Sequence, residues 1–290
     1  MNRTQCLTAE WLKTSNLSGD QLLLEALLRR GFLAFLDQEG VFLGSGSHAG
    51  DSAILKLVDG IEIFPTTARM DRVAKIAFRD SDQVAAAIRI VALGENHTGT
   101  GIGHFTGFGV GGYIKDDWPS YKRMKWGTKM AVCPAQVQGQ PDVWNALDTG
   151  IALLVKALPL ARVGTAYSCD GHGTEPANIE FHFPWDPQWA EAVFWILGAT
   201  TPGSTWHWGK RNVTIYPSLG YSDPAVLAML HDLQCVSRLL LNQQVIDRIE
   251  VARSNLMSDI KACNRWGDDL PPNDFIYESR RCLKNAFYDE

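Results

Sequence analysis

Apolar residues recur at helical spacing near the start of the chain. After Ser18, residues such as Leu23 and Leu27 fall on one side of a helical wheel, and charged residues fall on the other. Ser18 and Gln21 have the spacing of a capping box, in which each side chain pairs with a backbone amide at the helix start. The pattern therefore predicts a helix over 18–37.

The rest of the chain alternates between the period-two pattern of strands and the longer period of helices. Turn-forming residues separate these stretches, with glycine, proline, asparagine and aspartate at most boundaries. We predict strands at 41–43, within 53–64, and at 73–78, 163–169 and 179–183, a hairpin over 205–216, and helices at 83–93, 141–158, 189–197, 223–264 with a break near Asn242, and 274–287.

This order of elements predicts an α+β fold with a mixed sheet, flanking helices and a mostly helical C-terminal region. We expect an N-terminal α/β region over 1–114 that ends in a glycine-rich loop. A central α+β region over 115–222 and a helical region over 223–290 would follow. The pattern also allows these regions to form one continuous domain.

Composition narrows the function classes. The chain has 290 residues, 46% of them hydrophobic, which is enough to bury a core. Its net charge of −5 provides no general attraction to nucleic-acid phosphates. The longest apolar runs fall well short of the ~20 residues that span a bilayer, and no apolar stretch follows the N-terminal residues as in a secretory signal. We expect a soluble cytoplasmic protein with no membrane partner, whose six cysteines are mostly free thiols.

Two segments suggest ligands only weakly. The glycine-rich segment 94–113 lacks the G-x-G-x-x-G register, and no G-x-x-x-x-G-K-[ST] occurs in the chain, so we expect a flexible or strand-forming loop. Segment 121–129 mixes basic and aromatic residues, a composition that can bind single-stranded nucleic acid. It equally suits a surface turn or a protein interface, and the negative net charge argues against direct nucleic-acid binding.

The hexapeptide that ends in Gly173 brings Cys169 and His172 within three positions of each other across a glycine turn. A structural zinc site needs about four nitrogen or sulfur ligands, and no second Cys-x-x-Cys or His-x-x-x-His motif is present. We predict no metal and no cofactor, although His182 lies on the partner strand of the predicted hairpin and His207 lies on a later strand. His172 could activate Cys169 as a nucleophile if the turn folds back. We favour a structural role, in which Asp170, Gly171 and Gly173 shape a hairpin turn with positive φ angles, Cys169 packs inward and His172 bonds to the turn backbone, and we predict no catalytic residue.

The segment Thr165–Gly173, the following Ile179-Glu180-Phe181 and the C-terminal Arg280-Arg281-Cys282 together resemble the phage-encoded Gabija anti-defence proteins. The resemblance covers the central and C-terminal thirds of the chain. It implies a non-enzymatic inhibitor that forms a homo-oligomer around the bacterial Gabija complex, in contact with its nuclease subunit, and blocks DNA binding and cleavage in the host cytoplasm. It also implies that Cys282 joins protomers, through a disulfide that a reducing cytoplasm would oppose.

Two other functions remain open at this stage. One is a metal- or thiol-dependent enzyme that acts on a nucleotide or nucleic acid, centred on Cys169 and His172. The other is a nucleic-acid-binding accessory protein that uses residues 121–129, which would bind with a steep salt dependence.

Overall fold

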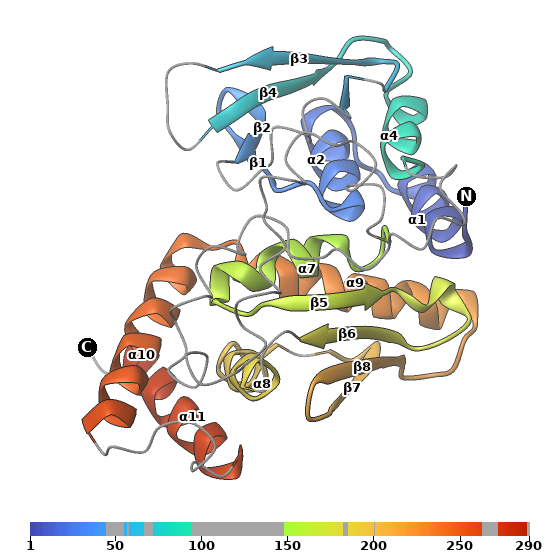
Figure 1. Cartoon of the computed structure of the whole chain (residues 1–290). Coiled ribbons are helices and arrows are strands. Elements are labelled where there is room, and N and C mark those ends of the chain that lie inside the picture. Colours follow the sequence, from blue (N-terminus) through green and yellow to red (C-terminus); the bar gives the residue numbers. More distant parts are fainter. Residues whose placement is uncertain are drawn as a thin grey trace.

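The computed structural model describes residues 1–44, 55–56, 58–66, 72–93, 148–181, 185–199, 201–262 and 272–288. These residues form an α+β fold with two four-stranded sheets and eight α-helices (Figure 1). The predicted α+β class is confirmed. The expected mixed sheet is not seen in this part of the chain, where every strand pairing is antiparallel. The glycine-rich segment, segment 121–129 and His182 lie outside the described residues.

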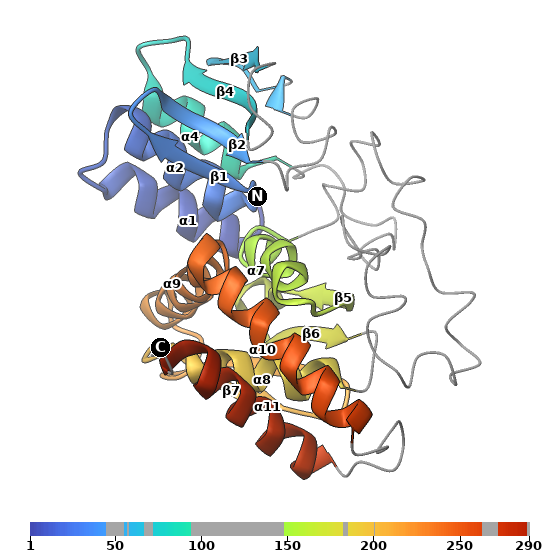
Figure 2. The same cartoon turned by 90° about the vertical axis from the view of Figure 1, so that its left-hand side faces the viewer.

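The first half of the chain builds one sheet with helices packed against it. Strands in the order β1-β2-β4-β3 form the sheet, α2 packs on β1, β2 and β4, and α1 and α4 pack against α2 (Figure 2). The elements are α1 (Arg3–Thr14), α2 (Gly19–Arg30), β1 (Ala34–Asp37), β2 (Gly40–Gly44), β3 (Ile61–Pro65), β4 (Arg72–Phe78) and α4 (Gln83–Val91).

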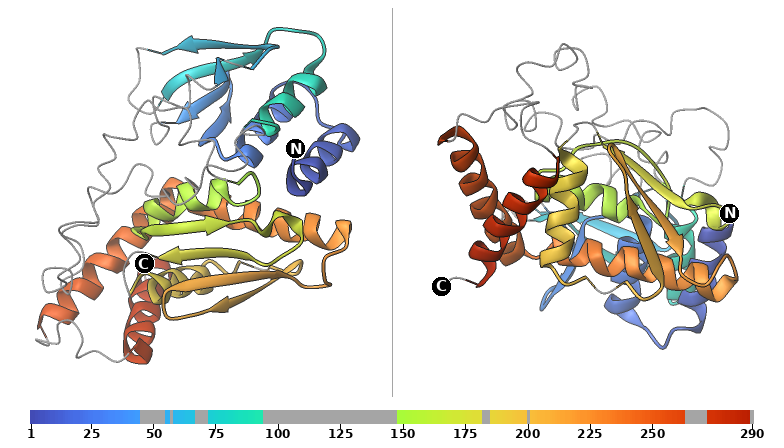
Figure 3. Two further views of the ribbon diagram at one scale, coloured as in Figure 1. Left: turned by 45° about the vertical axis from the view of Figure 1, so that its right-hand side comes forward. Right: turned by 90° about the horizontal axis from the view of Figure 1, so that it is seen from below.

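The second half builds the other sheet, in the order β5-β6-β8-β7. Helix α9 contacts α7, β7 and β8, whereas α11 packs against both α8 and α10 (Figure 3). The elements are α7 (Ala152–Ala157), the 3₁₀ turn η3 (Leu158–Ala161), β5 (Thr165–Cys169), the 3₁₀ turn η4 (Gly171–Gly173), β6 (Ala177–Phe181), α8 (Asp186–Ile196), β7 (Ser204–Trp208), β8 (Asn212–Pro217), α9 (Asp223–Leu240), α10 (Gln243–Ala262) and α11 (Pro272–Tyr288).

Each half of the chain has its own hydrophobic core. One contains buried residues of the first half together with Leu153 of α7, and the other contains residues of the second half, including the remaining apolar residues of α7. Helix α7 therefore lies where the two cores adjoin. The second core joins residues from the regions expected over 115–222 and 223–290, such as Val213 and Leu233. The expected boundaries themselves stay predictions.

The prediction of one helix over 18–37 is wrong, because α2 ends at Arg30 and the chain continues into β1. Gly31 takes a left-handed conformation with φ of 99°, and the amides of Gly31 and Phe32 both bond to the carbonyl of Leu27. This is the hydrogen-bond pattern that closes a helix at a glycine. The predicted capping box is also wrong, because Ser18 makes no side-chain cap and the Gly19 amide instead bonds to Gln83.

Other boundaries agree with the sequence pattern. The long helical region is interrupted as predicted, with Asn242 lying between α9 and α10 and accepting the amide of Gln244. The strand at 73–78 and the helix from 83 correspond to β4 and α4. Of the helix predicted over 141–158, the described part holds α7 only, preceded by a turn.

Among the described residues no single helix is both long and apolar enough to cross a membrane. Helix α9 and residues 243–260 of α10 meet that criterion only when they are joined across a 71° bend.

Candidate functional site

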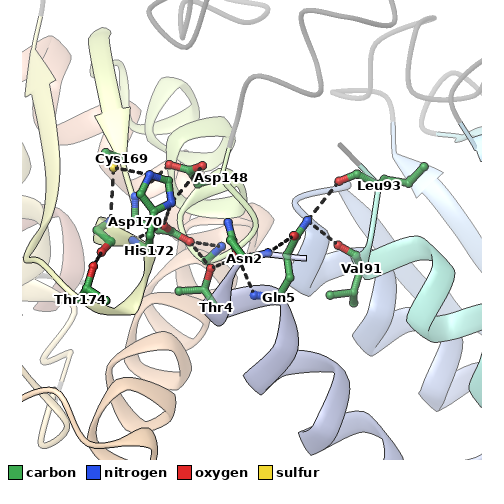
Figure 4. A network of polar contacts seen from close by, with 12 residues as sticks. Asn2, Thr4, Gln5, Val91, Leu93, Asp148, Cys169, Asp170, His172 and Thr174 are labelled. Atoms are coloured by element: carbon green, nitrogen blue, oxygen red, sulfur yellow. Dashed lines mark hydrogen bonds and ion pairs between the residues drawn. The ribbon is translucent and has the colours of Figure 1, made fainter. Parts of the chain in front are cut away.

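The turn after β5 places four reactive side chains together. Cys169 ends β5, Asp170 caps the 3₁₀ turn η4, and His172 lies within that turn. Asp148, in the turn before α7, approaches from a different part of the chain. Figure 4 shows these side chains grouped at the end of β5.

The backbone of the turn folds His172 back toward Cys169. Gly171, His172 and Gly173 all have positive φ, of 70°, 51° and 75°. A Cβ on Gly171 would lie 2.8 Å from the carbonyl carbon of Pro176, so only glycine fits there. The sequence reading of glycines with positive φ in this turn is confirmed. A histidine in the left-handed region is uncommon, and such strained residues cluster at functional sites.

The imidazole of His172 lies between the thiol and a carboxylate. Its Nε2 is 3.7 Å from Cys169 Sγ, and its Nδ1 is 3.4 Å from Asp170 Oδ1. The Asp148 carboxylate is also near, with Oδ1 at 3.9 Å from Nδ1. Each ring nitrogen thus has its own partner, in the order thiol, imidazole, carboxylate.

Asp170 is fully buried, and hydrogen-bond donors surround its carboxylate. Oδ1 accepts the amide of His172 at 2.8 Å and faces the imidazole, whereas Oδ2 accepts the Thr4 hydroxyl at 2.6 Å and the Gly150 amide at 3.3 Å. Thr4 Oγ1 also lies 2.8 Å from Asn2 Oδ1, but a hydroxyl has only one proton and Asp170 Oδ2 is the nearer acceptor. These contacts fix the orientation of Asp170 beneath the imidazole.

Helix α1 supports the turn from the first half of the chain (Figure 4). Besides the Thr4 contact, Arg3 Nη1 donates to the carbonyl of Gly173 at 2.6 Å and Arg3 Nη2 donates to that of Tyr221 at 2.7 Å. Gln5 Nε2 donates to the carbonyl of Val91, at the end of α4. The first turn of α1 therefore ties the candidate site to both halves of the structure.

The electrostatics favour a protonated imidazole. The contact with the Cys169 sulfur, together with the nearby carboxylates of Asp148 and Asp170, raises the pKa of His172 to about 9. His172 is therefore an imidazolium at neutral pH. Burial, and then repulsion from Asp170, raises the pKa of Asp148.

The same four residues could also hold a metal ion. Asp148, Cys169, Asp170 and His172 each offer one ligand atom, and these atoms lie within 4.8 Å of one another. Thiolate, imidazole and carboxylate are all zinc ligands. However, the Asp170 oxygens are already occupied by donors, and the sulfur and carboxylates face different ring nitrogens. The geometry fits a thiol–imidazole–carboxylate chain better than a shared ion.

Sequence reasoning found Cys169 and His172 but missed two of their neighbours. Asp148 lies 22 positions before Asp170 and reaches its backbone amide at 3.2 Å only through tertiary packing. Thr4 was missed because no helix was predicted over 3–14. The spacing of Asn2 and Gln5 carried that signal, since these two residues form the capping box that begins α1.

Other residues considered from the sequence lie elsewhere. His207 is on β7, with its ring 5.0 Å from that of Tyr216, and β7 is the edge strand farthest from β5. Cys282 is only 2% exposed and belongs to the second core, where burial raises its pKa to about 11. A disulfide from Cys282 to another protomer would require α11 to separate from its neighbours, and this role stays a prediction.

Comparison of the chain with protein-family models, with curated proteins and with solved structures finds no match.

Proposed function

We propose that the protein is a thiol-dependent enzyme in which Cys169 is the nucleophile and His172 the acid and base. The observation that carries this proposal is the contact of the two His172 nitrogens with different partners, Cys169 Sγ at 3.7 Å and Asp170 Oδ1 at 3.4 Å. Thiol hydrolases use this arrangement, because the imidazolium favours the thiolate and a carboxylate orients the ring.

The residues support acyl transfer to water. The Cys169 thiolate attacks the carbonyl carbon of an ester or amide, and the imidazolium of His172 gives its proton to the leaving group as the bond to carbon breaks. The neutral imidazole then takes a proton from water, which attacks the thioester. A carboxylic acid leaves, and the thiolate and imidazolium are restored. The Asp170 carboxylate holds the ring in place throughout.

Access to the reacting groups supports the same conclusion. The side chain of His172 is 55% exposed and Cys169 is half-buried, whereas Asp170 is fully buried. A substrate can therefore approach the thiol and imidazole from solvent while the orienting carboxylate stays protected. The nucleotide or nucleic-acid substrate considered from the sequence stays a prediction.

The test is the reactivity of Cys169 toward iodoacetamide between pH 5.5 and 9, followed by peptide mass spectrometry. Cys6 is exposed in the same chain and serves as an internal reference. We expect Cys169 to react about tenfold faster than Cys6 at pH 6, because thiolate is the reactive form. The variant His172→Gln should remove this difference. A panel of esters and amides should then reveal turnover that Cys169→Ser abolishes.

Two results would refute the proposal. One is an identical pH dependence for Cys169 and Cys6 in the folded protein. The other is stoichiometric zinc in protein purified without chelators, together with loss of that zinc in both Cys169→Ser and His172→Gln, which would assign the cluster to a metal.

Binding to the Gabija complex, implied by the sequence resemblance, stays a prediction, as do the homo-oligomer and the host cytoplasm that go with it. The thiol–imidazole–carboxylate geometry now favours an enzyme over the non-enzymatic inhibitor expected from the sequence. Co-elution of the purified chain with the complex, together with loss of DNA cleavage, would support the inhibitor hypothesis. Failure to co-elute would exclude that hypothesis.

A further inference from the structure

A pocket lies at the edge of the second sheet opposite to Cys169. Residues of α8, β7, α9 and α11 line a cavity of about 410 Å³. This volume falls within the range of about 300–1,000 Å³ that is typical of small-molecule sites. Because β5 and β7 are the two edge strands of the sheet, this pocket is separate from the proposed catalytic site.

Aromatic rings form one wall of the pocket. Trp206 and Trp208 both lie on β7, with ring centroids 6.1 Å apart and planes 28° apart. Phe194 of α8 meets Trp206 edge-on, at 5.3 Å and 85°. Trp195 on the same helix also lines the pocket and is 49% exposed.

The position of Trp206 is fixed from behind by a hydrogen-bond chain. Its Nε1 donates to Ser204 Oγ at 2.9 Å, and that hydroxyl donates to Asp232 Oδ2 of α9 at 2.8 Å. Burial raises the pKa of Asp232. These two hydrogen bonds hold the indole in one orientation before any ligand binds, which lowers the entropic cost of binding.

A pair of opposite charges also lines the pocket. Arg280 Nη2 lies 3.2 Å from Glu191 Oε1, and the guanidinium lies 5.2 Å from the Trp195 ring centroid. Arg280 Nε is buried and, among the residues that the structure describes, has no hydrogen-bond partner. The pair has no net charge, so it selects neither an anion nor a cation. It can still donate to and accept from hydroxyl groups, and hydrogen bonds of charged groups are the stronger kind.

We propose that this pocket binds a neutral carbohydrate. The C–H bonds of a sugar ring carry partial positive charge and stack on the negative face of an indole. The sugar hydroxyls would bond to Arg280 and Glu191 and to the hydroxyls of Thr201 and Thr205 that also line the pocket. A phosphate would meet the carboxylate of Glu191, and a quaternary ammonium would meet the guanidinium of Arg280.

Titration of the full chain with neutral disaccharides tests this proposal. The probes are cellobiose, maltose and chitobiose at up to tens of millimolar, with indole N–H signals followed by NMR. Adenosine and choline serve as the competing probes for a stacked base and for a cation. We expect saturable shifts of the Trp195 and Trp206 signals with at least one disaccharide, and none with adenosine or choline.

Two pocket variants and one control variant test whether the disaccharide binds in this pocket. Trp195→Ala and Arg280→Gln should each weaken disaccharide binding about tenfold, through loss of ring stacking and of a charged donor. Tyr277→Ala is the matched control, because Tyr277 is 69% exposed on α11 and does not line the pocket. The Tyr277→Ala variant should bind the disaccharide as tightly as the parent protein does. Circular dichroism should show that all three variants are folded.

The proposal fails if the folded chain gives no saturable shift with any of the three disaccharides. It also fails if adenosine or choline binds more tightly than the sugars, or if Trp195→Ala and Arg280→Gln bind as the parent does. None of these results bears on Cys169, because the iodoacetamide test is carried out without sugar.

Discussion

The hydroxyl of Thr4 donates a 2.6 Å hydrogen bond to Oδ2 of Asp170, and both residues are fully buried although they lie 166 positions apart. Asp170 in turn faces Nδ1 of His172. The first turn of α1 therefore holds the carboxylate that orients the imidazole. Thr4 acts on the candidate site through Asp170, and this makes it a positioning residue.

The variant Thr4→Val should destabilise the protein by about 1–3 kcal/mol, because it keeps the shape of the side chain and removes a donor to a buried carboxylate. It should also slow iodoacetamide labelling of Cys169, since Asp170 would orient His172 less well. Urea unfolding and labelling rates measure the two effects.

Thr14→Val is the matched control for Thr4→Val. Thr14 is an exposed residue of the same helix, and within the described part of the chain its hydroxyl bonds only to the carbonyls of Glu10 and Trp11 in that helix. We expect Thr14→Val to change the free energy of unfolding by less than about 0.5 kcal/mol and to leave Cys169 labelling as in the parent protein. Thr4→Ser keeps the donor and should restore normal labelling. Slow labelling in Thr4→Ser would argue against the hydrogen bond as the cause.

Stability should fall with rising pH between about 6.5 and 9 because of His172. Its contact with the Cys169 sulfur and its two neighbouring carboxylates raise its pKa to about 9 in the folded state. The unfolded value is about 6.5. The folded state therefore binds the proton more tightly, so this contribution is complete below pH 6.5 and is lost as the pH approaches 9. Urea unfolding across this range measures the slope, which His172→Gln should reduce.

NMR titration of the imidazole gives an independent measurement of the same group. Asp148→Asn removes one of the charges that raise the pKa of His172, so its titration should move to lower pH. A midpoint near 6.5 in the parent protein would contradict the proposed thiol–imidazole pair.

Local sequence patterns predicted the elements better than their contacts. The strand and helix at β4 and α4 and the break at Asn242 follow from patterns within a few residues. Helix α2 ends just before Gly31, whereas the helical spacing of apolar residues continues beyond this glycine and gives no sign of the end. Strand β6 pairs with β8, although helix α8 and strand β7 lie between them in the sequence, and no local pattern indicates this pairing.

The candidate site shows the same limit. Cys169 and His172 are three positions apart, so a folded-back turn could be foreseen from the glycines between and after them. Asp170 was read only as a turn residue, because its burial against Thr4 depends on how α1 packs. Asp148 joins the site because α7 places it beside β5, which no spacing in the sequence indicates.

Cys282 should resist alkylation in the folded protein. Its side chain is 2% exposed, and burial raises its pKa to about 11, so both access and ionisation oppose reaction. We expect mass spectrometry after iodoacetamide treatment at pH 8 to find Cys6 and Cys235, which are exposed, modified before Cys282. Labelling of Cys282 should appear only in denaturant. A disulfide-linked dimer on a non-reducing gel that Cys282→Ser abolishes would contradict this expectation and support the role implied by the sequence resemblance.

Gly31 should be intolerant of even a methyl group, for two separable reasons. Its φ of 99° is strained for any L residue, and a Cβ there would overlap the Cβ of Ala152 on α7. The contact lies where the two cores adjoin, since α7 contributes to both. Gly31→Ala should therefore cost about 1–3 kcal/mol for the backbone, with a further cost for the overlap.

A double-mutant cycle with Ala152→Gly separates these two costs. Removing the Cβ of Ala152 relieves the overlap with that atom, but it leaves the backbone strain and the close approach to backbone atoms of Ala152 and Leu153. It also adds about 1 kcal/mol for glycine in a helix. The double variant should therefore be more stable than the sum of the two single changes predicts, by the energy of the overlap alone. Gly220→Ala is the control, because Gly220 has φ of 74° and its Cβ would meet nothing within 4 Å. Strict additivity of the two substitutions in urea unfolding would show that α2 and α7 do not meet at Gly31.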